Sequence, residues 1–366
     1  MKYKFFETLK QSFESYKATW PLRMKSRIKS KFIFFVIPVV LIVFFLRVYG
    51  TENQQDTIFP ILSGLMMLLF LFYFRKTEKI NIIITKQKEE LSYQKNIIET
   101  QKKDVEIAKL IIEEKNKAIT DSITYAKRIQ EAKLPKKEEI YFSFPQSFIL
   151  FKPKDIVSGD FYFFHKTNQS IFIAAADCTG HGIPGAFMSL IGSEKLEDAV
   201  LQSGDTSEIL KQLNIGIKTS LKQSGSDEST RDGMDIAICS VDTETRIVKY
   251  AGANRPIWLI REGQTEVEET KATKKAIGGL TEDEQHFDTH ELKLKQGDTF
   301  YIFTDGYADQ FNDKNKKLLT KKFKEILPDI QDKSMQEQEK YLEDFIENWK
   351  AGTDQVDDIL VIGVRL

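Results

Sequence analysis

The stretch "ADCTGHGIPGAFMSL", Ala176–Leu190, holds the feature from which the fold can be argued. It follows the apolar run "SIFIAA", which is typical of a buried strand, and it leads into a segment with helical periodicity. Asp177 therefore lies where an apolar strand ends at a glycine-rich turn. Burying an aspartate at such a place costs free energy unless a cation accompanies it. The rest of the sequence has to indicate which cation that is.

Other acidic residues lie at strand ends in the same way. Asp160 opens "GDFYFF", Asp305 closes "TFYIFTDG", and Asp357 and Asp358 open "DDILVIGV". Any one of them can be an ordinary turn residue. Strand ends of a sandwich gather at one edge, however, and carboxylates gathered there would repel each other unless divalent cations bridged them. Oxygen ligands of this kind suit Mg²⁺ or Mn²⁺ and not zinc.

The segment 140–366 has the pattern of one α+β domain. Short aromatic or β-branched runs separated by turn signals predict strands, and helical periodicity is confined to about 183–223 and 317–350. Strands in hairpins and helices in separate blocks favour α+β over alternating βαβ units. About 225 residues are enough for one large core.

Two long apolar runs precede this domain, at 32–49 and 58–74, joined by the short loop 50–57. Each approaches the length needed to cross a bilayer, so we predict a transmembrane hairpin. Residues 1–31 are basic, Lys/Arg also follow the second run, and the loop has none. The positive-inside rule then places both termini and the domain in the cytoplasm.

Charge is unevenly distributed along the chain. Residues 1–76 contain twelve Lys/Arg and four Asp/Glu, about +8, and because the whole chain is −1 the remainder is about −9. A nucleic-acid-binding protein would carry its basic surface on the folded domain, so this class is excluded. A basic N-terminal segment fits an anionic membrane surface instead.

Residues 75–135 predict a long coiled-coil helix and a homodimer. The heptad column consists of Ile84, Leu91, Ile98, Val105, Ile112, Ile119 and Ala126. Its companion column is polar, with Gln87, Gln94, Gln101 and Lys115. Two interpretations remain open: a rigid spacer, or a signalling rod that transmits a change of rotation or register. Pro135 ends the helix, and "PKKEE" is interpreted as a hinge.

Six motifs in order carry a resemblance: "DIVSGDFY", "ADCTGHGIPGAFMS", "RDGMDIAICSVD", "YAGANRPIWLI", "GDTFYIFTDGYADQFN" and "DDILVIGV". The sequence from 142 to 366 is similar to the metal-dependent protein phosphatases (PPM, protein phosphatase 2C-like), in particular to their SpoIIE/RsbU branch. The resemblance implies an αββα sandwich with two Mn²⁺ or Mg²⁺ ions at one edge. Together with the hairpin, it implies a location in the bacterial cytoplasmic membrane.

The resemblance also implies roles for individual residues. Asp177 would bridge both metals, with the backbone carbonyl of Cys178 as a further ligand. Asp160, Asp305 and Asp357 would complete the set, and Asp358 is the runner-up for the last position.

Three more residues have two interpretations each. Asp232 and Asp235 would either support a third metal or be plain turn and strand residues. His181 is either a general acid or a structural residue of the turn.

A water bridging two such ions could attack a phosphomonoester without a nucleophilic serine or cysteine. Cys178 and Cys239 are accordingly interpreted as reduced core cysteines. Relatives often have "AGHNPP" where this chain has "AGANRP", so Arg255 would either approach substrate phosphate or pair with a surface carboxylate. In this branch the substrate is commonly a phosphoserine or phosphothreonine of a regulatory protein, often an anti-sigma-factor antagonist.

Two other function classes compete with the phosphatase. A non-catalytic membrane scaffold, a pseudo-phosphatase, would have the same domains without the chemistry. A nucleotidyl cyclase would also use two metals, but it should show a nucleotide-binding signature, and the sequence has no P-loop.

Overall fold

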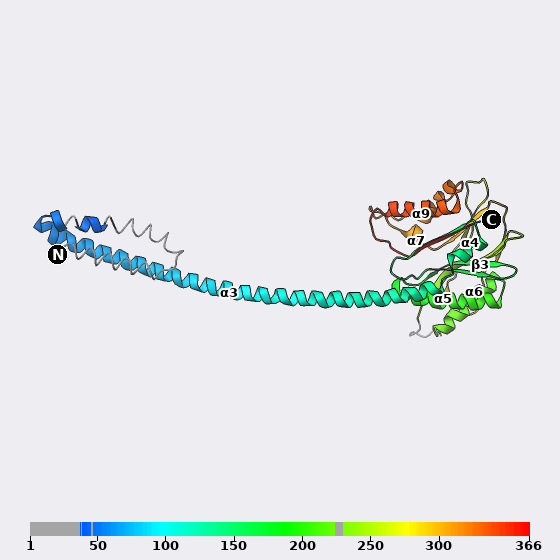
Figure 1. Cartoon of the computed structure of the whole chain (residues 1–366), viewed down its shortest axis with the longest axis horizontal. Helices are drawn as coiled ribbons and strands as arrows, with labels where there is room; N and C mark the ends of the chain where they lie inside the picture. Colours follow the sequence, from blue (N-terminus) through cyan, green and yellow to red (C-terminus); the bar gives the residue numbers. More distant parts are fainter. Residues whose placement is uncertain (1–36, 38, 45–46, 224–229) are drawn as a thin grey trace. The chain divides into compact units, whose positions relative to one another are not determined.

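A computed structural model describes residues 37, 39–44, 47–223 and 230–366 (Figure 1). The chain divides into two compact units, Met1–Leu110 and Ile111–Leu366. The predicted basic segment 1–31 lies outside the described residues, and so do residues 32–36, 38, 45 and 46 of the first predicted membrane span.

The second unit contains two antiparallel sheets. The five-stranded sheet has the order β1-β11-β10-β6-β7. Its strands are β1 (Ser147–Lys152), β11 (Ile359–Arg365), β10 (Thr299–Phe303), β6 (Ile257–Ile260) and β7 (Glu268–Thr270). β11, "ILVIGVR", is apolar almost throughout because both of its faces are covered, and only Arg365 is partly exposed.

The six-stranded sheet has the order β2-β3-β4-β5-β9, with the short β8 paired to β4. Its strands are β2 (Phe161–Lys166), β3 (Ile171–Cys178), β4 (Gly233–Asp242), β5 (Ile247–Ala253), β8 (Ile277–Gly278) and β9 (His290–Lys293). The register of β3 and β4 places Asp177 directly opposite Asp235. Two acidic residues thus face each other at the end of a strand pair.

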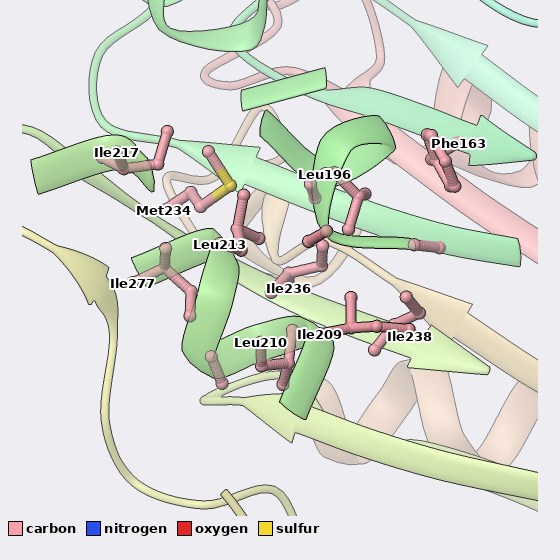
Figure 2. Close-up of a cluster of buried hydrophobic side chains, with 14 of the residues drawn as sticks. Phe163, Leu196, Ile209, Leu210, Leu213, Ile217, Met234, Ile236, Ile238 and Ile277 are labelled. Atoms are coloured by element: carbon pink, nitrogen blue, oxygen red, sulfur yellow. The ribbon is translucent and has the colours of Figure 1, made fainter. Parts of the chain in front are cut away.

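Helices cover both outer faces of the two sheets. α5 (Gly182–Gln202) and α6 (Thr206–Ser220) pack on the six-stranded sheet through a core that includes Leu196, Leu213 and Ile236 (Figure 2). α8 (Thr320–Ile326) and α9 (Met335–Lys350) share a core with the five-stranded sheet. A third core fills the space between the sheets. These layers confirm the predicted α+β, αββα sandwich.

Local signals set the ends of the covering helices. The side chain of Asp205 accepts hydrogen bonds from two backbone N–H groups at the start of α6. Ser334 and Glu337 form a reciprocal capping box at the start of α9. These caps satisfy donors that a helix leaves unpaired at its first turn.

α3 (Glu52–Lys133) is one continuous helix. It contains both the second predicted membrane span and the predicted coiled coil, so the structure shows no break between them. Among the described residues, α3 alone has the length and hydropathy to cross a bilayer, and the shorter apolar helix Val39–Tyr49 falls below that length. The two-helix membrane hairpin therefore stays a prediction.

The end of α3 agrees with the sequence. The helix stops at Lys133, two residues before Pro135, as predicted. Residues 134–136 are not helical, and α4 (Lys137–Ser143) follows, with Ile140 fully buried in the core between the sheets. The interpretation of "PKKEE" as a hinge stays a prediction.

Candidate active site

The predicted acidic residues surround a cleft of about 550 Å³ in the second unit. Asp177, Asp235, Asp305 and Asp357 line it, and so do His181 and Arg255. Asp177 and Asp235 come from neighbouring strands, while Asp305 follows β10 and Asp357 precedes β11. The structure therefore brings together carboxylates that are up to 180 residues apart in the sequence.

Asp160 and Asp358 lie deeper, at 3% and 2% exposure. The Thr304 hydroxyl donates to Asp160 Oδ2 at 2.6 Å. The two oxygens of Asp358 accept the backbone N–H groups of Lys154 and Gly159, each at 2.7 Å. Asp358 thus holds the loop before Asp160. The residue that the sequence offered as the alternative last ligand therefore has a structural role.

Burial and mutual repulsion disfavour the charged forms of these carboxylates, as their raised pKa values indicate. Burial raises the pKa of Asp177 to about 8, even though the Arg255 guanidinium acts in the opposite direction. Burial, with the charge of Asp177, also raises the pKa of Asp160 well above its usual range. The pKa values of Asp235 and Asp357 are raised by burial as well. Such clustering of raised carboxyl pKa values is typical of functional sites.

Arg255 lies in the middle of this cluster. Its Nη2 atom is 2.7 Å from Asp177 Oδ2, 2.8 Å from Asp305 Oδ2 and 3.2 Å from Asp235 Oδ2. The sequence offered a substrate phosphate or a surface carboxylate as its partner, and the surface alternative was wrong. No sequence signal placed it here, because the contact depends on the β4–β5 register, which brings Asn254 and Arg255 beside Asp235.

The remaining sequence-predicted residues lie nearby with defined partners. His181 is the N-cap residue of α5, and its side chain is 53% exposed. Its Nδ1 is 2.9 Å from Asp155 Oδ2. The Thr179 hydroxyl donates to Asp232 Oδ1 at 3.4 Å and accepts from the Gly233 N–H. Gly180, with φ of +84°, makes the turn between them that a side chain would strain.

Both cysteines are free and buried, as predicted. Burial, reinforced by the charge of Asp177, raises the pKa of the Cys178 thiol far above its usual range. A thiol in this state is not a nucleophile near neutral pH. The cleft chemistry therefore does not pass through Cys178 sulfur.

We tested whether these residues suit a divalent cation. Over the described ranges, no group of three or more His, Cys, Asp or Glu side chains already has the spacing of a formed metal site. Three carboxylates nevertheless converge on one cationic nitrogen, and all the donors are oxygens. Carboxylate oxygens are the ligands that Mg²⁺ and Mn²⁺ prefer, so the chemistry of this donor set fits such an ion.

The comparisons with known proteins agree with this geometry. Residues 167–366 match the family described as Stage II sporulation protein E (SpoIIE). The chain belongs to the SpoIIE family. The resemblance inferred from the six motifs, to the SpoIIE/RsbU branch of the PPM phosphatases, is thereby confirmed.

Two individual proteins are similar to this SpoIIE domain. The SiaA-PP2C domain of Pseudomonas aeruginosa is 29% identical, with a TM-score of 0.62, and the match covers 69% of this chain and 98% of that one. Phosphoserine phosphatase RsbU of Bacillus subtilis (strain 168) is 30% identical over 161 residues. That alignment covers 43% of this chain and 44% of RsbU, so it spans less than half of either protein.

Sequence reasoning missed several residues that support the SpoIIE site. Besides Arg255 in its observed role, they are Thr304, Asn254 and Gln130. Gln130 near the end of α3 is 7% exposed; its Nε2 donates to the Ser158 carbonyl at 2.6 Å and to the Ser189 hydroxyl at 2.7 Å, and its Oε1 accepts from the Ser158 N–H. A lone glutamine in a polar helix gives no such signal.

Gly306→Ala should destabilise this site. Gly306 follows Asp305, and a Cβ built there would lie 1.9 Å from the Asp358 carbonyl oxygen, so the backbone carrying Asp305 or Asp358 must shift. We expect the free energy of unfolding to fall by about 1–3 kcal/mol, as for other overpacked sites. Denaturant unfolding measures this. Gly204→Ala is the matched control, since nothing lies within 4 Å of its Cβ, and an equal loss in both variants would contradict the clash.

Proposed function

We propose that the chain is a metal-dependent protein phosphatase that hydrolyses phosphoserine or phosphothreonine on a regulatory protein. The observation that carries the proposal is the convergence of Asp177, Asp235 and Asp305 in one cleft of a SpoIIE-family domain. RsbU, which is a phosphoserine phosphatase by name, supports the choice of substrate. An anti-sigma-factor antagonist is the regulatory protein that the resemblance favours.

The acidic residues of the cleft have separate roles in the proposed function. Asp177, Asp305 and Asp357, which line the cleft, would hold two Mn²⁺ or Mg²⁺ ions together with the Cys178 carbonyl. The more deeply buried Asp160 would complete this set of ligands. Asp235 and Asp232 are the candidates for a third ion. When bound, such ions supply a water that is partly deprotonated near neutral pH and neutralise charge on the phosphate.

The other groups of the chain orient and confine the reaction. Thr304 fixes Asp160 by donating to its Oδ2, and Asp358 fixes the loop 154–159 by accepting two backbone N–H groups. His181 lines the same cleft and is held by Asp155, so it is the candidate to protonate the leaving serine or threonine oxygen.

We also propose that α3 controls the site from a membrane anchor. Its apolar segment 58–74, with 32–49, would span the cytoplasmic membrane, leaving both termini and the phosphatase domain in the cytoplasm. Its heptad column, which is exposed from Leu91 to Ile119, would pair two chains. Gln130 supports the control step, because its hydrogen bonds with Ser158 join α3 to the loop that ends at Asp160. A shift of α3 would therefore move the loop that carries Asp160 at the proposed metal site. This coupling favours a signalling rod over a rigid spacer.

One observation favours a second function. The Arg255 guanidinium fills the carboxylate cluster as a built-in cation, which is what a pseudo-phosphatase scaffold would show. The scaffold would keep the membrane and coiled-coil parts and lack the reaction.

Phosphate release separates the two functions. The purified full chain is incubated with a phosphoserine peptide and Mn²⁺ or Mg²⁺, and inorganic phosphate is measured. We expect release that depends on the added metal and stops with EDTA. Absence of release at every metal concentration, with the protein folded by circular dichroism, would favour the scaffold.

A further inference from the structure

Arg255 makes an unusual set of contacts for an arginine in a structural ion pair. One nitrogen, Nη2, contacts carboxylates from three segments of the fold: Asp177 on β3, Asp235 on β4 and Asp305 after β10. Structural Arg–carboxylate pairs commonly use two nitrogens in a fork. Three carboxylates gathered at one end of a guanidinium resemble instead the way in which oxygen ligands surround an ion.

One other nitrogen of the guanidinium, Nε, has no hydrogen-bond partner over the described ranges. Nε of Arg255 is buried and, among the described residues, is the one buried side-chain nitrogen or oxygen without a hydrogen-bond partner. A buried donor without a partner costs free energy. The guanidinium is therefore held at Nη2, by its ion pairs and by hydrogen bonds to Asp177 and Asp305, while its buried Nε is left without a partner in the described part of the chain.

The backbone of Arg255 is anchored independently of its side chain. The Tyr250 hydroxyl donates to the Arg255 carbonyl at 2.5 Å, and the preceding Asn254 donates through Nδ2 to Asp235 Oδ1 at 2.8 Å. The side chain is a flexible stem that lines the cleft. The guanidinium can therefore leave the carboxylates by rotating its own side chain, with the strand left in place.

We propose that Arg255 is an internal competitor for the divalent cation: its guanidinium neutralises Asp177, Asp235 and Asp305 in the metal-free chain and must leave before an ion binds. Arg255 is then a positioning residue that sets the metal concentration at which the site is formed. This inference rests on the proposed metal-dependent function.

The test is the affinity of the full chain for Mn²⁺ alone, measured by titration calorimetry and by the free-Mn²⁺ spin resonance signal. Removing a competitor that occupies the site most of the time raises the apparent affinity by the inverse of the fraction that is free. We therefore expect Arg255→Gln to bind Mn²⁺ at least about tenfold more tightly than the unaltered chain.

Arg231→Gln is the matched control. Arg231 lines the same cleft, and no contact between it and these carboxylates is found over the described residues. The substitution removes the same charge, so it should change the affinity by no more than about twofold, as a screened long-range effect. Equal tightening in both variants would overturn the proposal, because the general charge of the cleft would then explain it.

Further variants keep the outcome decisive. Should Arg255→Gln fail to fold, Arg255→Lys retains a positive charge but loses the planar fork, and we expect intermediate tightening. Mn²⁺ binding no tighter than in the unaltered chain, for whichever of the two variants folds, overturns the proposal.

Asp305→Asn separates this inference from the proposed function. It should abolish the binding that is measured, which places the ion at this cluster. If the unaltered chain bound no Mn²⁺, or bound it equally well with Asp305→Asn, the proposed metal centre itself would fall. If the binding requires Asp305 and Arg255→Gln does not tighten it, only the competitor role falls.

Discussion

Asp305→Asn lowers metal-dependent phosphate release by at least about a hundredfold, the scale at which groups that stabilise transition-state charge act. Asparagine has the shape of aspartate but lacks the charge that a divalent ion requires from its ligands. The side chain of Asp305 is 40% exposed, so the fold does not depend on its burial. The measurement is initial phosphate release with saturating Mn²⁺, together with the midpoint of thermal unfolding.

The control for this prediction lies four residues along the chain. Asp309 ends the short helix α7 (Gly306–Asp309) and pairs with Lys317 at 2.7 Å, and it is not among the residues that line the cleft. Asp309→Asn makes the same chemical change next to the site and should keep most of the activity. Near-normal turnover in Asp305→Asn with an intact fold would remove the assignment of Asp305 as a ligand.

Asp177→Asn should behave as Asp305→Asn does. In addition, it removes the carboxylate that faces Asp235 across β3 and β4. Asp177 lies in β3 and Asp305 follows β10, so a common loss of activity would show that strand ends far apart in sequence act on one centre.

The layered fold could be predicted because its signals are local. Each major strand is a short apolar run ended by turn residues, and the covering helices have apolar periodicity in two blocks, so the alternation of types identified an α+β sandwich. The strands that the sequence did not reveal, β7 and β8, are three and two residues long. Segments of that length have no periodicity to detect.

The acidic residues of the site could be predicted for a related reason. An aspartate at the end of a buried strand is expensive, so its position is informative before any partner is known. The partners themselves could not be predicted. Arg255 reaches the cluster through the register of β4 and β5, and Gln130 reaches Ser158 across 28 residues. Such contacts are properties of the packed fold and leave no trace in composition or spacing.

The end of α3 shows what a local signal can and cannot give. Pro135 predicts the break after Lys133. The short helix α4 that follows depends on the burial of Ile140 between the sheets, which is a property of the packed fold.

Replacing Ile98 and Ile112 together by lysine should convert the chain from dimer to monomer. Both residues belong to the heptad column, and both are exposed in the single chain, at 62% and 57%. Pairing two helices would bury this column, and two lysines per chain would place like charges in the seam. Because the companion column is already polar, few apolar contacts remain to hold the pair, so we expect dissociation over the micromolar range. Light scattering of the full chain at known concentrations measures the mass.

The control adds the same charge to the outer face of the same helix. Asn96→Lys with Thr100→Lys lies at heptad positions away from the column, in the same two turns as Ile98. This pair should leave the mass at that of a dimer. Loss of the dimer in both doubly substituted chains would point to general repulsion, and an unchanged dimer with lysine at 98 and 112 would mean that the chains pair through another surface. The rate of Mn²⁺-dependent phosphate release is measured on the same samples. If the site depends on α3 through Gln130 and Ser158, the rate of the monomer should differ from that of the dimer. A passive spacer would leave the rate unchanged.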